Sequence, residues 1–186
     1  AVTIAAAMDG VVDPKFAVAF GKLGGLAVLN LMGIYTRYDN PYAVLEEIVT
    51  SPVEKATELI QAVYREPIKE KLIGRRIEEI KKGGVPCVVS AIPQHAERFG
   101  AVAQEAGADG FVVQATVTTA RHLSRAYQPL DLKKFIASSE IPVIVGNCVT
   151  FDVALELMET GPVALLVGIG PGAACTTREV LGIGVP

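Results

Sequence analysis

Hydrophobic and polar residues form repeating blocks along most of the chain. Short apolar runs rich in β-branched residues are each followed by a segment in which apolar positions recur with helical spacing. The apolar runs predict strands over 1–8, 26–31, 86–91, 110–115, 142–146 and 162–167. The periodic segments predict helices over 14–23, 94–106, 130–138 and 151–159, and a further helix that starts at Cys175. Continuous apolar strands are typical of sheets buried on both faces, so the pattern predicts a parallel α/β fold.

Residues 34–84 depart from this alternation. Tyr, Arg, Lys and Glu are interleaved there with apolar residues at helical spacing, and Gly83 and Gly84 close the segment. The spacing predicts three helices inserted between the second and third strands.

Consecutive βα units with right-handed crossovers leave two architectures, a TIM barrel and a doubly wound sheet. Two observations favour the barrel. Polar candidates such as Gln114 and Asn147 directly follow strands, and no Gly-x-Gly-x-x-Gly motif joins the first strand to the first helix. A (β/α)8 barrel has eight strands in about 250 residues. We therefore expect residues 1–186 to be one barrel domain with about its first six βα units present, truncated on the C-terminal side.

Composition narrows the function classes. The chain has 186 residues, of which 51% are hydrophobic, and a net charge of −3, which argues against binding to nucleic acid or to a membrane surface. No apolar run is long enough to span a bilayer, so we expect a cytoplasmic protein. The three cysteines are widely spaced and there are only two histidines, so neither a disulfide framework nor a zinc site is predicted.

Residues 162–181 carry the strongest chemical signal. An apolar strand leads into glycines at alternate positions (Gly168, Gly170 and Gly172), and Cys175 follows where a helix is predicted to begin. Free backbone N–H groups and the helix dipole at such a position favour a thiolate. From spacing alone two interpretations stay open: a mounted nucleophile, and a buried, inert cysteine in a strand-to-helix turn.

The string from Gly168 to Arg178, Gly-Ile-Gly-Pro-Gly-Ala-Ala-Cys-Thr-Thr-Arg, resembles the catalytic-cysteine loop of the IMP dehydrogenase / GMP reductase family. Segments 7–12, 23–30 and 142–150 also resemble, in order, the family's first strand, its second strand and its Gly-Asn strand end. The likeness thus extends over nearly the whole chain.

The resemblance implies a set of site residues. Cys175 would attack C2 of the purine, with Thr177 near the reacting carbon. Met8, Asn147, Gly172 and Ala173 would bind the nucleotide, and Gln114, Asn147, Gly168 and Gly170 would bind the cofactor. The carbonyls of Gly170, Gly172 and Cys175 would hold a monovalent cation, potassium.

The resemblance also implies an activity. The expected reaction is that of an IMP dehydrogenase in GMP biosynthesis, in which IMP and NAD give XMP and NADH. The alternatives are a GMP reductase that uses NADPH and a non-catalytic nucleotide-binding barrel. A homo-tetramer is implied as well, and we expect the 186-residue piece to be inactive alone.

Four positions depart from the family pattern. Ala173 replaces a phosphate-binding serine, Gln114 replaces an acid, Ala6 replaces a serine, and Leu166 replaces a basic residue. The long regulatory insert that many IMP dehydrogenases carry is also absent. This combination resembles the divergent IMP dehydrogenase-related branch of the family. Two interpretations of Arg121 and His122 remain open: contacts with a phosphate, and positions in a solvated loop.

Overall fold

The computed structural model describes residues 2–120, 128–173 and 175–185, so Arg121 and His122 lie outside the described part of the chain. The chain divides into two compact units. The first contains Ala1–Ser90 and Ala101–Asp109, and the second contains Ala91–Gly100 and Gly110–Pro186.

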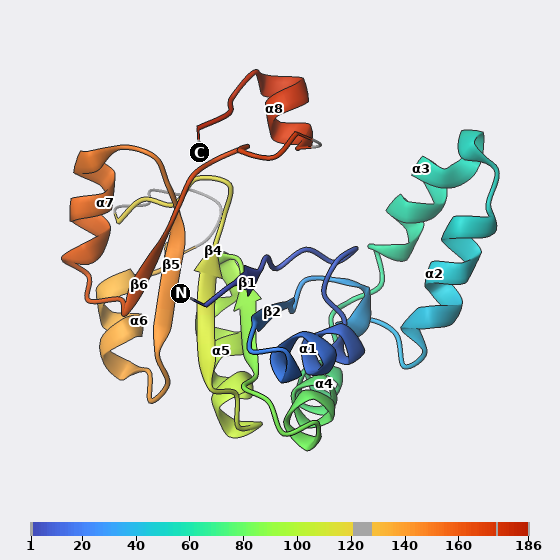
Figure 1. The fold of residues 1–186 in the computed structure, drawn as a ribbon, viewed down its shortest axis with the longest axis horizontal. Coiled ribbons are helices and arrows are strands. Elements are labelled where there is room, and N and C mark those ends of the chain that lie inside the picture. Colours follow the sequence, from blue (N-terminus) through green and yellow to red (C-terminus); the bar gives the residue numbers. More distant parts are fainter. Residues whose placement is uncertain (1, 121–127, 174, 186) are drawn as a thin grey trace. The chain divides into compact units, whose positions relative to one another are not determined.

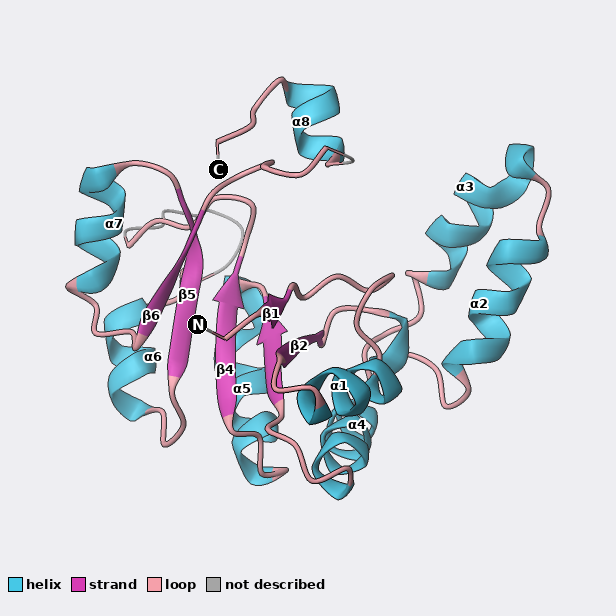
Figure 2. Ribbon diagram, in the orientation of Figure 1, coloured by secondary structure: helices cyan, strands magenta, loops and turns pink. Residues whose placement is uncertain are grey.

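Each unit is built on parallel strands in sequence order (Figure 2). In the first unit, β2 (Leu26–Asn30) pairs with β1 (Ile4–Ala5) and with β3 (Val88–Ala91). In the second, β5 (Val143–Cys148) pairs with β4 (Gly110–Gln114) and with β6 (Ala164–Val167). All six predicted strands are thus present, although β1 is much shorter than residues 1–8.

The helices also follow the predicted periodicity. The first unit contains α1 (Pro14–Lys22), the short 3-10 helix η1 (Ile34–Thr36), α2 (Pro41–Thr50), α3 (Val53–Val63) and α4 (Glu70–Lys82). The second contains η2 (Pro93–His95), α6 (Leu132–Ser138), α7 (Phe151–Met158) and α8 (Thr176–Leu181), and the two units share α5 (Ala96–Glu105). Side chains fix several helix starts, because Asp13, Asn40, Asp131 and Thr150 each accept a hydrogen bond from a backbone N–H of the first turn.

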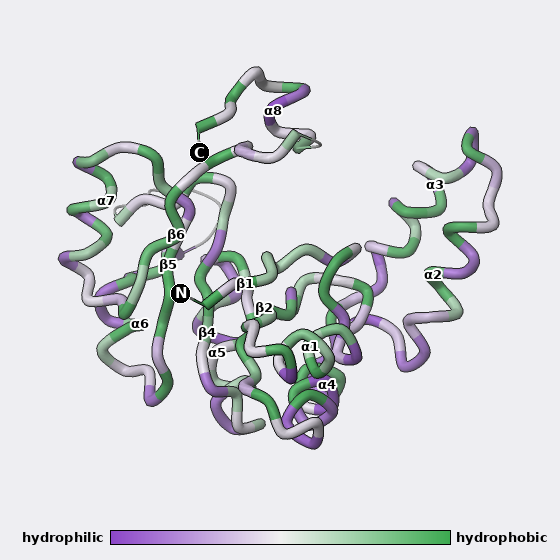
Figure 3. Tube along the Cα trace, in the orientation of Figure 1, coloured by the Kyte–Doolittle hydropathy of each residue, from purple (hydrophilic) through white to green (hydrophobic). Residues whose placement is uncertain are grey.

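Helix α4 shows how the first unit forms its core. Its apolar residues Leu72, Ile73, Ile77 and Ile80 are fully buried, whereas its charged residues lie mostly on the opposite face. Figure 3 shows this as alternating green and purple along the helix. Burial of each such side chain stabilises the folded state by about 2 kcal/mol, so this apolar face contributes much of the free energy that holds α4 in the first unit.

One charged residue of α4 is buried with the apolar face. Arg76 is only 4% exposed, and its guanidinium donates to the carbonyls of Tyr35 (2.8 Å), Tyr38 (3.1 Å) and Asp39 (3.1 Å). It also forms an ion pair with Glu79 at 2.8 Å. Arg76 therefore supplies donors to one carbonyl of η1 and to two carbonyls of the segment that follows it.

Helices α2 and α3 form a hairpin that projects away from α1 and α4 (Figure 1). Its base is fixed by polar contacts: the Tyr42 hydroxyl donates to Asp13 at 2.9 Å, and the Tyr38 hydroxyl donates to the Val63 carbonyl at 3.0 Å. Its tip is apolar and open, with Val49 82% and Val53 85% exposed. Of the three predicted helices of residues 34–84, the first two thus form an arm attached at its two ends, and the third, α4, packs into the core.

Asp9 holds the loop after β1 in place. Its carboxylate accepts the Ile34 N–H at 2.9 Å, and the Tyr64 hydroxyl donates to the same carboxylate. Burial and then this hydrogen bond raise the pKa of Tyr64 above its usual range. Gly33 must be glycine here, because a Cβ at this position would overlap the Asp9 carboxyl group. Asp9 thereby fixes the backbone beside Met8.

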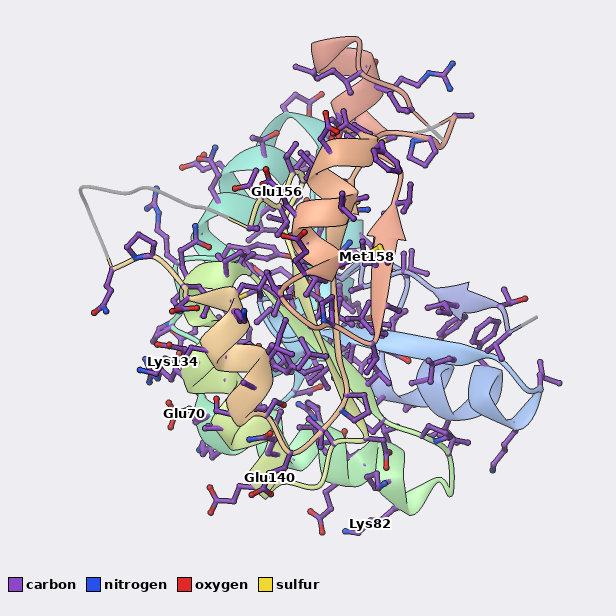
Figure 4. The ribbon with its side chains drawn as sticks, turned by 90° about the vertical axis from the view of Figure 1, so that its left-hand side faces the viewer. Glu70, Lys82, Lys134, Glu140, Glu156 and Met158 are labelled. Carbon is purple, nitrogen blue, oxygen red and sulfur yellow. The ribbon has the colours of Figure 1, made fainter. Side chains whose placement is uncertain are left out.

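The second unit has a core of its own beneath β4 and β5. Phe111 packs edge-to-face against Phe135 at 5.9 Å between ring centres, and Leu157 of α7 is fully buried. The outer faces of α6 and α7 are polar or exposed, as Lys134, Glu156 and Met158 show in Figure 4. The helices thus cover the strands with one apolar face each.

Candidate active site

The site predicted from the sequence lies mainly in the second unit, where β4, β5 and β6 end. Gln114 is the last residue of β4, Asn147 lies near the end of β5, and Gly168 directly follows β6. The carboxyl ends of parallel strands meet at one edge of a sheet, which is where α/β folds place their chemistry.

Side chains join these three strand ends in a relay. The Gln114 amide Nε2 donates to Asn147 Oδ1 at 3.2 Å, and Asn147 Nδ2 donates to the Gly168 carbonyl at 2.9 Å. The structure thus links Gln114 to Asn147 and Asn147 to Gly168 by hydrogen bonds.

The loop after β4 also grips the end of β5. The Ala115 N–H donates to the Gly146 carbonyl at 3.0 Å, and the Asn147 N–H donates to the Ala115 carbonyl at 3.1 Å. The buried Thr118 donates from its hydroxyl to Gly146 at 2.5 Å and from its N–H to Asn147 at 2.9 Å. Thr118 was not among the predicted site residues. Its position after a strand is typical of a site residue, but Val117 and Thr119 have the same position, so the sequence does not single out Thr118.

Gly146 makes this close approach of β5 and β6 possible. A Cβ at that position would meet the Leu166 side chain and come within 2.8 Å of the Leu166 carbonyl oxygen. The strand also has an irregular register between Gly146 and Cys148, so that Asn147 is displaced from the regular pairing.

The cysteine loop is closed at its two ends. Gly168 donates its N–H to the Cys148 carbonyl at 2.9 Å, and Ile169 and Val185 exchange backbone hydrogen bonds of 2.8 and 2.7 Å. Gly170 has φ +61°, and a Cβ there would overlap the Ile183 carbonyl oxygen. Gly170 thus allows a close backbone approach, in which the approaching group is another part of the same loop.

Cys175 directly precedes α8 and is half-buried. The backbone N–H of Arg178 and then that of Thr177 lower the pKa of the Cys175 thiol, with a further contribution from the Thr177 hydroxyl, and together they outweigh the opposing effect of burial. A lowered pKa increases the thiolate fraction at neutral pH, which is the form that attacks carbon. Of the two interpretations left open by spacing, the environment favours the nucleophile.

The remaining predicted residues lie as follows. Gly172 and Ala173 are exposed, and the Gly172 carbonyl accepts the Cys175 N–H at 3.2 Å. Thr177 is half-buried. Met8 belongs to the first unit, where it is 58% exposed and its carbonyl accepts the N–H groups of Val11 and Val12.

Two cavities are lined by described residues of the second unit. The larger has a volume of about 270 Å³ and mostly apolar walls, and is lined by Thr116, Val117, Cys148, Val149, Thr150, Val153, Ile169, Thr177 and Ile183. The smaller, about 160 Å³, borders the end of β4 and is lined by Pro93, Gln94, Val113, Ala115, Val117, Thr118, Thr119, Leu130 and Leu132. Thr177, two residues after the cysteine in the sequence, thus lines the larger cavity.

We expect the three thiols to differ in reactivity. Burial, followed by the nearby Asp109 charge, raises the pKa of Cys87 to about 12, although Lys81 opposes this. In folded protein, iodoacetamide should therefore alkylate Cys175 first and Cys87 last. The alkylation rate of Cys175 should rise with pH and reach its plateau at a lower pH than the rate of an ordinary thiol, whose pKa is about 8.5. Mass spectrometry of digests sampled over time measures both, and equal labelling of Cys87 and Cys175 in folded protein would contradict the assignment.

Comparison with known proteins identifies the family. The sequence profile of the IMP dehydrogenase / GMP reductase domain matches residues 2–186. The chain belongs to the IMP dehydrogenase / GMP reductase family.

Within the part of the chain that the structure describes, no helix is long and apolar enough to cross a membrane, and no cluster of His, Cys, Asp and Glu could hold a metal ion.

Individual relatives refine the picture. The chain is 37% identical over 184 residues to an uncharacterized oxidoreductase of Mycobacterium tuberculosis, covering 96% of this chain and 49% of that protein. It is 43% identical over 82 residues to an inosine-5'-monophosphate dehydrogenase of Cryptosporidium parvum, covering 44% of this chain and 19% of that protein. The chain spans about half the length of the uncharacterized oxidoreductases that it matches.

A solved structure gives the fold. The crystal structure of an IMP dehydrogenase/GMP reductase-like protein from Corynebacterium glutamicum superposes with a TM-score of 0.87 at 29% identity, covering 98% of this chain and 48% of that chain. The prediction of a (β/α)8-type barrel represented by about six βα units is thereby confirmed.

Proposed function

We propose that the protein to which this chain belongs oxidises a purine nucleotide at C2 with a nicotinamide cofactor, as an IMP dehydrogenase does. The observation that carries the proposal is the environment of Cys175. Its thiol has a lowered pKa, follows a closed glycine loop at the end of a parallel strand, and remains half-exposed. Family membership then supplies the substrate class.

The reaction would proceed in two covalent stages. The Cys175 thiolate adds to C2 of IMP and forms a C–S bond, which turns C2 tetrahedral. When bound, NAD accepts the hydride that leaves C2, so that the nucleotide is oxidised and NADH is formed. Water then attacks the resulting thioimidate, the C–S bond breaks, and XMP and the Cys175 thiolate are released with one proton. The N–H groups of Arg178 and Thr177 favour the thiolate at the start and at the end.

Gln114 and Asn147 fit a ligand that carries hydroxyl groups. A primary amide has two hydrogens, and each of these side chains uses one of them in the relay, which leaves one hydrogen on each for a nucleotide or cofactor. We propose that the cofactor lies along this edge, past Gly168 and Gly170, and that the nucleotide contacts Asn147, Gly172 and Ala173.

A monovalent cation fits the same loop. Gly172 has one carbonyl lone pair engaged by the Cys175 N–H, and its second lone pair remains for a cation. Backbone carbonyls are oxygen ligands of the kind that hard cations take. We propose that the carbonyls of Gly170, Gly172 and Cys175 would hold potassium, which would fix the loop around the cysteine.

The test uses the full-length protein. With IMP and NAD, we expect absorbance at 340 nm to rise while XMP forms, and we expect 6-chloro-IMP to arylate Cys175 in a reaction that IMP blocks. Loss of 340 nm absorbance with GMP and NADPH would overturn the assignment in favour of a GMP reductase. Nucleotide binding with neither turnover nor an adduct would overturn it in favour of a non-catalytic barrel.

A further inference from the structure

Gln114 takes part in a hydrogen-bond relay whose direction is fixed at one end. The Gly168 carbonyl can only accept, so Asn147 must direct its Nδ2 toward Gly168 and its Oδ1 toward Gln114. Gln114 must then present its own Nε2, at 3.2 Å, as the donor. The orientation of two side-chain amides is therefore determined by one backbone carbonyl.

We propose that Gln114 is a positioning residue, which acts through Asn147 to fix the first peptide of the cysteine loop. Gly168 is held by its N–H on Cys148 and by its carbonyl on Asn147, at 2.9 Å in each case. Only the second of these bonds depends on a side chain. The bridge between Ile169 and Val185 begins one residue later, so the position of Gly168 sets where the closed loop starts.

The relay requires a neutral amide at residue 114. A glutamate has nearly the same shape, but its carboxylate at neutral pH has no hydrogen to donate, and it would face Asn147 Oδ1 as a second acceptor. Rotating the Asn147 amide to satisfy the carboxylate would turn Oδ1 toward the Gly168 carbonyl and move the repulsion to the loop. Methionine has a similar length and no charge, so it only removes the donor.

This chemistry gives an order of effects. Gln114→Glu should disturb the loop more than Gln114→Met, because it adds repulsion to the loss of a hydrogen bond. A role that depended only on side-chain shape would give the reverse order, since glutamate is the closer match in shape to glutamine.

The first measurement needs no substrate. In the full-length protein, we expect hydrogen exchange of the Gly168 and Ile169 amides to be about tenfold faster in Gln114→Glu than in the wild type, with Gln114→Met between them. The amides within β4 should be unchanged. Gln128→Glu makes the same substitution at an exposed residue outside the relay and should leave exchange at Gly168 unchanged. Unchanged exchange in Gln114→Glu would overturn the proposal.

The second measurement rests on the proposed function and asks whether the relay serves catalysis. Turnover should fall in the same order as loop protection, with kcat affected more than KM for the cofactor. A rise in cofactor KM with unchanged loop exchange would mean that Gln114 acts only through its contact with the cofactor, and would overturn the positioning role. If loop exchange responds as expected while even the wild type shows no turnover, the relay stands and the proposed function fails.

Discussion

Replacing Cys175 by serine should lower nucleotide oxidation by at least about a thousandfold in kcat. The amide N–H groups of Arg178 and Thr177 lower the pKa of the Cys175 thiol and so increase its thiolate fraction at neutral pH, whereas a serine hydroxyl has too high a pKa to ionise there. None of the groups that shift the pKa of Cys175 is a general base that could deprotonate a serine at this position. Steady-state kinetics of the full-length variant with IMP and NAD measure the loss, and nucleotide affinity should change little.

The matched control is Cys87→Ala. Cys87 is fully buried in the first unit, its pKa is raised rather than lowered, and it is not among the predicted site residues. We expect this variant to retain turnover within a fewfold of the wild type. Substantial turnover in Cys175→Ser would exclude covalent catalysis by this thiol.

Replacing Arg76 by methionine should lower the free energy of unfolding by about 3 kcal/mol. The substitution keeps much of the aliphatic volume but leaves the carbonyls of Tyr35, Tyr38 and Asp39 without their donor. Urea denaturation followed by circular dichroism gives the change as a lower midpoint.

Arg75→Met provides the comparison for this prediction. Arg75 is the adjacent residue, and its side chain is 52% exposed while it pairs with Asp39 and Glu79. Exposed ion pairs of this kind contribute less than about 1 kcal/mol. Equal destabilisation by the two variants would show that the carbonyl contacts of Arg76 do not stabilise the fold.

Most of the secondary structure was predictable because burial imposes a period on the sequence. Strand β4 and helix α4 differ in the spacing of their apolar residues, and that spacing is visible without coordinates. The same criterion, apolar character, overestimates the length of strand β1. Residues 1–8 are apolar, but pairing with β2 extends only over Ile4 and Ala5, and apolar character carries no information about which backbone groups find a partner.

The sequence allowed the placement of Gln114 and Asn147 at the ends of strands, but it did not allow prediction of their hydrogen bonds. Both residues lie near the carboxyl ends of parallel strands, which is enough to bring them to one edge of a sheet. That their amides bond to each other and to Gly168 depends on the irregular register of β5, which leaves no trace in the sequence. Thr118 was missed because one buried hydroxyl among several polar loop residues cannot be recognised before the loop's path is known.

The contacts at the base of the α2–α3 hairpin determine how readily residues can be inserted into the hairpin or deleted from it. The Tyr38 hydroxyl, before the hairpin, donates to the Val63 carbonyl at its end, so the two ends of the hairpin lie close together. For a loop closed in this way, doubling the number of residues costs only about 0.6 kcal/mol of closure entropy. We therefore expect residues inserted at the exposed tip between Val49 and Val53 to have little effect on the pairing of β2 with β3.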